Sequence, residues 1–146
     1  DNVTMDLYRS RLDEIDFQYM DVGDVGNSVV CHDGGFYFHR GQEQQICYFK
    51  DGNVTELPIA GCAYRLWRNQ IIYLDSIDFK ADTYCEVKIY DLDTGEIKTL
   101  CEGASFDIHL LEDKYLGYVK HTDKGKPHII IDLETGEQIE VCRRER

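Results

Sequence analysis

The chain has few prolines and no long apolar run. Two prolines among 146 residues leave little room for a disordered linker. No window of about 18 consecutive apolar residues occurs, so the sequence predicts no membrane span. The chain begins with Asp1 instead of Met, and no charged segment followed by an apolar run precedes the domain. We therefore expect a processed product or a fragment of a longer protein.

Motifs that carry catalytic or cofactor chemistry are also missing. The chain has no G-x-S-x-G elbow, no P-loop and no G-x-G-x-x-G fingerprint. Its five histidines show no H-E-x-x-H spacing. The acidic stretch from Asp75 to Asp82 lacks the glycine and the terminal glutamate of an EF-hand loop. The sequence thus predicts no catalytic residue, no cofactor and no metal ion.

Basic residues are scarce as well. Lys and Arg total 16 against 28 Asp and Glu, which gives a net charge of −12. Such a surface repels phosphate backbones and anionic lipid, so we predict no nucleic-acid partner and no adhesion to anionic membrane. The short basic tail at 143–146 does not reverse this balance.

What the sequence does contain is a repeat of about forty residues. Each unit holds an apolar run that ends in a turn with glycine, and these glycines stand at 52, 95 and 136, so the spacings are 43 and 41. After each turn comes an alternating strand with an apolar residue five positions past the glycine, at Leu57, Leu100 and Val141. A strand-rich period of this length is typical of β-propeller blades.

Each unit also holds two further predicted strands upstream of its hairpin. One set covers 35–39, 70–75 and 114–120, and the other covers 28–31, 62–67 and 105–111. Four strands per unit predict an all-β chain of propeller-type blades, each of four antiparallel strands. The expected division is a half blade or cap at 1–27, then blades at 28–58, 59–103 and 104–146.

The N-terminal segment is less regular, and two interpretations remain open. Leu7 to Asp13 and Phe17 to Met20 can form a hairpin that keeps the period, with Glu14–Asp16 as its turn. Alternatively, an apolar stripe at intervals of three and four residues predicts a helix. We favour the hairpin, which gives three to three and a half blades in total.

Six cysteines are present and none forms a C-x-x-C pair, which argues against a zinc ribbon. Cys101 and Cys142 occupy the same place in successive repeats, which indicates a small apolar residue at the end of a strand. We favour free buried thiols, with one or more disulfides as the alternative.

The chain resembles the TolB-like propellers, which are common among bacterial exported and envelope proteins. The resemblance rests on the unit Asp-Leu-Asp-Thr-Gly-Glu at Asp91 to Glu96, nearly repeated at Asp132 to Glu137. The Gly-His and Trp-Asp pairs of WD40 propellers are missing. The resemblance implies a scaffold with binding surfaces, and no family catalytic residue can be carried over.

A binding surface is predicted on one innermost strand, because such strands line the central channel of a propeller. The candidates are Tyr64, Arg65, Trp67 and Arg68. An exposed Trp beside Arg makes a stacking or anion-contacting patch. The alternative is that Trp67 packs between blades.

Fewer than four blades do not close a ring, and an unclosed end leaves strand edges exposed. One hypothesis is a homodimer that completes a ring of about seven blades, and the other is a fragment. We predict a non-enzymatic interaction domain for a protein or glycan partner, at an extracellular or cell-surface location. The alternatives are the propeller portion of a glycan-processing or peptidase enzyme and the sensor domain of a membrane-anchored regulator.

Overall fold

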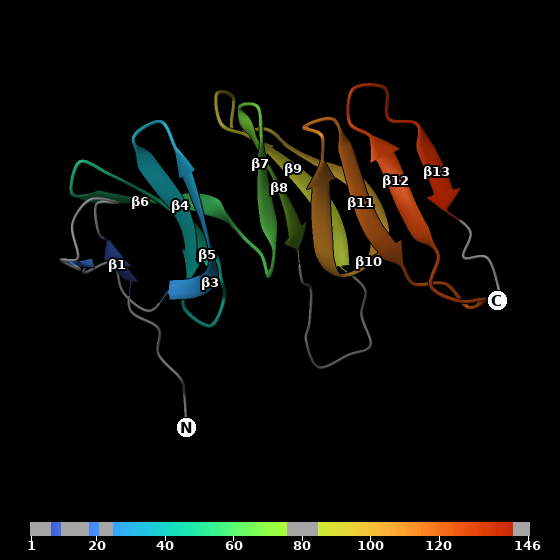
Figure 1. The fold of residues 1–146 in the computed structure, drawn as a ribbon, viewed down its shortest axis with the longest axis horizontal. Coiled ribbons are helices and arrows are strands. Elements are labelled where there is room, and N and C mark those ends of the chain that lie inside the picture. The colour runs from blue at the N-terminus through green and yellow to red at the C-terminus, as the bar shows by residue number, and fades with distance from the viewer. Residues whose placement is uncertain (1–6, 10–17, 21–24, 76–84, 142–146) are drawn as a thin grey trace. The chain divides into compact units, whose positions relative to one another are not determined.

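The structure, a computed structural model, describes residues 7–9, 18–20, 25–75 and 85–141. These residues form antiparallel strands joined by turns, and no helix occurs among them. The chain divides into two compact units, Asp1–Ala60 and Gly61–Arg146. The predicted all-β fold of four-stranded blades is confirmed, and Figure 1 shows the strands in both units.

The first unit contains a four-stranded sheet in chain order. Its strands are β3 (Val25–His32), β4 (Gly35–Arg40), β5 (Gln45–Lys50) and β6 (Asn53–Ala60). Tight turns join β3 to β4 at Asp33-Gly34 and β5 to β6 at Asp51-Gly52, with positive φ at all four turn residues. Phe38 and Cys47 lie fully buried on one face of this sheet.

The N-terminal segment of the first unit contains a hairpin. Strand β1 (Leu7–Arg9) pairs antiparallel with β2 (Gln18–Met20), with Leu7 opposite Met20. This pairing confirms the hairpin and excludes the helix as the structure of these two segments. The predicted turn at 14–16 lies outside the described residues, and the assignment of this hairpin to a half blade stays a prediction.

The second unit is a seven-stranded sheet in which every neighbour is the next strand in sequence. Its strands are β7 (Tyr64–Trp67), β8 (Gln70–Asp75), β9 (Cys85–Asp91), β10 (Ile97–Leu111), β11 (Tyr115–Lys120), β12 (His128–Asp132) and β13 (Gln138–Val141). Figure 1 shows them from green to red. The division into blades at 28–58, 59–103 and 104–146 stays a proposal.

Strand β10 pairs with a different neighbour along each of its halves. Its first half pairs with β9, from Ile97 to Ala104, and its second half pairs with β11, from Ala104 to Leu111. Register shifts interrupt both ladders, and Gly103 adopts a positive φ of 79° between the two halves. The sequence predicted two separate strands here, whereas the backbone continues through both. We call β7, β8, β9 and the first half of β10 the middle blade, and the remainder the C-terminal blade.

The core of the second unit lies between these two blades. The middle blade contributes Ile72, Leu74 and Val87, and the C-terminal blade contributes residues from β10, β11 and β12. Those residues are Ala104, Ile108, Leu116, Tyr118, Ile129 and Ile131. Alternation along each strand places these side chains on one face of each blade. Blade-on-blade packing therefore holds this unit together.

The repeated Asp-Leu-x-Thr-Gly motif is a structural turn. The Asp91 carboxylate accepts hydrogen bonds from the backbone N–H groups of Asp93 and Thr94, both at 2.9 Å. The Gly95 N–H donates to the Asp91 carbonyl at 2.8 Å, with a φ of 72° at the glycine. The Asp132 carboxylate accepts two backbone bonds in the same way. The aspartate and the glycine of each motif thus fix the connection between two strands.

The carboxylate of this turn predicts a pH dependence of stability. The backbone bond from Thr94 lowers the pKa of Asp91 below its ordinary value of 3.8. A lowered pKa contributes stability that is present above the ordinary value and lost as the pH falls through the folded-state pKa. We expect Asp91→Asn to lower the urea midpoint at pH 7, and the difference from the parent chain to shrink below about pH 4.

The control for this experiment is Asp93→Asn, which removes the same charge two residues away. Urea unfolding at several pH values compares the two variants. If both lose stability equally at every pH, then the loss of one surface charge explains the result and the turn does not.

Candidate functional site

The four residues predicted to bind a partner lie in β7 and the turn after it. Tyr64 and Trp67 are buried, with exposed fractions of 1% and 6%. Arg65 is half-buried and donates from Nη1 to the Tyr64 carbonyl at 2.8 Å. Arg68 is exposed and adopts a positive φ of 55° in the turn.

Trp67 connects the two blades of the second unit. Its Nε1 donates a hydrogen bond to the carbonyl of Asp113, in the turn between β10 and β11, at 2.8 Å. The Arg68 guanidinium lies over the indole, 4.6 Å from the ring centroid, and forms an ion pair with Glu134. The structure therefore brings Trp67 and Arg68 together, with the indole packed between blades. The role of Tyr64, Arg65, Trp67 and Arg68 in binding a partner stays a prediction.

A second surface, which the sequence did not predict, lies on the C-terminal blade opposite the core. Pairing places His109, Gly117, Ile130 and Ile139 in one row across β10, β11, β12 and β13. Leu111 and Val141 stand in neighbouring rows on the same side of the sheet. We call these six residues the outward face.

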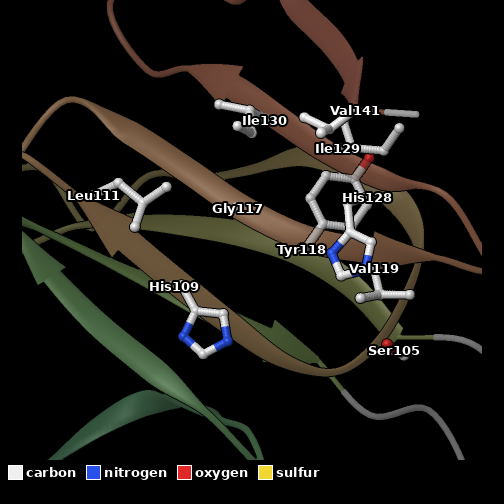
Figure 2. A pocket seen from close by; sticks show the side chains of 10 residues that line it. All are labelled: Ser105, His109, Leu111, Gly117, Tyr118, Val119, His128, Ile129, Ile130 and Val141. Atoms are coloured by element: carbon white, nitrogen blue, oxygen red, sulfur yellow. The ribbon is translucent and has the colours of Figure 1, made fainter. Parts of the chain in front are cut away.

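The outward face is apolar and hollowed. A cavity of about 350 Å³ is lined by Leu111, Gly117, Ile130 and Val141, with His109 and His128 among its other walls. Gly117 lies at its middle, where the missing side chain leaves space between Leu111 and Ile130, as Figure 2 shows. Ile139, beside the cavity, is 63% exposed. Large apolar side chains gathered on one sheet face are typical of an interaction surface.

One pattern in the sequence could have predicted this outward face. The run Ile129-Ile130-Ile131 in β12 is apolar on both sides of the sheet, whereas a strand with one solvated side alternates. Ile129 and Ile131 belong to the core, and Ile130 lines the outward cavity. Apolar residues on both sides of a strand are typical of strands that are buried on both faces.

The described ranges contain no three His, Cys, Asp or Glu side chains grouped closely enough to hold a metal ion. Within the same ranges, no helix has the length and apolar character needed to cross a membrane. The five cysteines that the structure describes, from Cys31 to Cys101, are free thiols. Cys142 lies outside the described residues.

Comparisons with known proteins identify the fold. No protein-family model matches the chain. No curated protein matches it either. Among solved structures, the crystal structure of TolB from Acinetobacter baumannii is similar, with a TM-score of 0.68 and 17% sequence identity. The match covers 96% of this chain but only 38% of that TolB chain. At this identity the likeness concerns the fold alone, and the chain therefore has a TolB-like β-propeller fold.

Proposed function

We propose that this chain is a non-enzymatic interaction domain that binds a protein through the outward face of its C-terminal blade. The observation that supports this proposal is the apolar, hollowed sheet face around Gly117, with Leu111, Ile139 and Val141 exposed at its margin. The apolar lining favours a protein over the alternative glycan partner, because sugars offer mainly hydroxyl groups to a binding surface.

The partner that fits this face is another blade. The opposite face of the same blade shows what such a surface packs against, because its residues from β11 and β12 share one core cluster with residues from β8 and β9 of the middle blade. The outward face repeats this arrangement of apolar side chains on paired strands. A sheet of similar curvature would bury Ile130 and Ile139 as the core buries Ile129 and Ile131.

We commit to a second copy of this chain as the source of that blade. About three and a half blades leave a propeller open, and two such chains would supply about seven, a number that closes. In a dimer with two-fold symmetry, each contact between the two chains occurs twice. Two-fold symmetry is also the commonest symmetry among homo-oligomers. The family resemblance further favours an extracellular or cell-surface location, which is part of this proposal.

The oligomeric state tests this proposal. Light scattering after gel filtration at micromolar concentration is expected to give twice the chain mass of 17.0 kDa. Ile139→Lys places a charge on the outward face and is expected to shift the species to monomer, because an unpaired charge resists burial in an interface.

Ile97→Lys is the matched control, because Ile97 is also an exposed isoleucine of the second unit, 46% exposed, on the first half of β10. It is expected to leave the dimer unchanged. A parent chain that stays strictly monomeric at micromolar concentration would overturn the second copy as the partner. Equal loss of the dimer in both variants would overturn the outward face as the interface.

A further inference from the structure

The outward face has a counterpart inside the same chain. Gly117 is the third residue of β11, as Ile72 is the third residue of β8. Each pairs with an isoleucine on the next strand, Gly117 with Ile130 and Ile72 with Ile89. Ile72 is buried in the core between the middle and C-terminal blades, and Ile89 packs against that core. This equivalence indicates that the outward face suits a further blade in the same way.

The surface that packs on the middle blade is the opposite face of the C-terminal blade. Leu116 and Tyr118 are the second and fourth residues of β11. They pair with Ile131 and Ile129 of β12, and all four side chains belong to the core. A blade that docks on the outward face therefore needs a comparable set of apolar side chains at the same places in its strands.

The first unit contains such a set. Phe36 and Phe38 are the second and fourth residues of β4. They pair with Phe49 and Cys47 of β5, and Val29 of β3 lies opposite Phe38. We call these five residues the receiving face. The first unit thus carries the kind of face that the C-terminal blade uses to pack on the middle blade.

The receiving face and the outward face are complementary in shape. Val29 is 43% exposed, so the receiving face is accessible along β3. The half-buried rings of Phe36 and Phe49 stack with their centroids 5.0 Å apart, and they are bulkier than the leucine and isoleucine at the same places in the C-terminal blade. The outward face shows the opposite change, because Gly117 stands where the middle blade has Ile72 and a cavity of about 350 Å³ opens there. Bulky rings on one face suit a hollow on the other.

We propose that the outward face of one copy docks on the receiving face of the other copy, and that this contact occurs twice in the dimer. The inference rests on the proposed dimer and adds to it the surface that the partner contributes. Each copy supplies one face of each kind, so a two-fold axis repeats the contact. If two outward faces packed on each other instead, the receiving face would take no part in the dimer.

Val29→Lys tests the receiving face. The substitution places a charge at an exposed position of this face, and it is expected to shift the dimer to monomer in light scattering after gel filtration. Thr55→Lys is the matched control, because Thr55 is an exposed residue of β6 that pairs with Tyr48, on the opposite side of the same sheet. It is expected to leave the dimer unchanged.

A mixture of two monomeric variants tests whether the two faces meet. In a mixed dimer of Val29→Lys with Ile139→Lys, one contact carries both charges and the other contact carries neither. The intact contact is expected to restore a dimer whose dissociation constant is roughly 10²–10⁴-fold above that of the parent, because one of two linked contacts remains. Native mass spectrometry identifies the mixed dimer when one variant carries a tag of known mass. Recovery of the dimer also shows that neither variant is monomeric through misfolding.

The outcomes separate this inference from the proposed function. A parent chain that is monomeric overturns both. If Val29→Lys stays dimeric while Ile139→Lys is monomeric, then the receiving face is excluded and an outward face that pairs with itself remains. If both variants are monomeric and form no mixed dimer within the expected range of dissociation constants, then the docking of these two faces on each other is wrong.

Discussion

Replacing Trp67 with alanine is expected to lower the free energy of unfolding of the second unit by about 3–5 kcal/mol. The indole is buried between the middle and C-terminal blades, so its removal leaves a cavity that the surrounding strands fill only in part. The Asp113 carbonyl also loses the hydrogen bond from Nε1. Urea unfolding followed by far-UV circular dichroism measures the change, since the variant has no tryptophan left for fluorescence.

Two companion variants separate the contributions at this position. Trp67→Phe keeps an aromatic ring but removes the donor, and is expected to cost about 1–2 kcal/mol. Arg68→Ala removes the cation above the ring and an exposed ion pair, and is expected to cost less than about 1 kcal/mol. If Trp67→Ala costs no more than Arg68→Ala, then the indole is not a core residue and the predicted exposed patch regains support.

Gly61→Ala is expected to destabilise the same unit by about 2–3 kcal/mol. A Cβ atom at Gly61 would lie 2.4 Å from the carbonyl oxygen of Leu74, a distance that real Cβ atoms do not show. The obstacle is the backbone of β8 at Leu74, which cannot move without disturbing the pairing of Leu74 with Val87 in β9. Glycine is therefore required here by the close approach of two chain segments.

Gly117→Ala is the matched control for this prediction. Its Cβ would lie 3.7 Å from the nearest atom, Cδ1 of Leu111, which is ordinary contact. We expect this variant to stay within about 0.5 kcal/mol of the parent chain in the same urea experiment. Equal losses at Gly61 and Gly117 would contradict the close approach at Leu74, because a Cβ atom at Gly117 meets only ordinary contacts and a clash could not then explain both losses.

The local elements of this fold were predictable from the sequence because their signals are local. Alternation along the strands and glycines such as Gly52 and Gly95 mark hairpins whose geometry depends on a few consecutive residues. The predicted strands at 105–111 and 114–120 likewise left only a short connection for the turn at Glu112-Asp113, where both residues take positive φ without any glycine. The strands and turns that depend on a few consecutive residues were therefore predicted correctly from the sequence.

The candidate site was harder to predict because it depends on distant residues. The partner of Trp67, the Asp113 carbonyl, lies 46 positions further along the chain, so no local pattern reports whether the indole is exposed. The outward face has the same difficulty, because the strand pattern shows that Ile129 and Ile130 point to opposite sides but does not show which side the middle blade covers.

The continuity of β10 has a consequence for how the second unit opens. A fluctuation that separates β9 from β10, or β10 from β11, removes hydrogen bonds from one and the same strand. The two blades are therefore expected to form a single foldon, in which amide protons of β9 and β11 exchange with deuterium at comparable rates. A partner whose binding slows amide exchange in the strand on one side of β10 would then also slow amide exchange in the strand on the other side, without any change of shape.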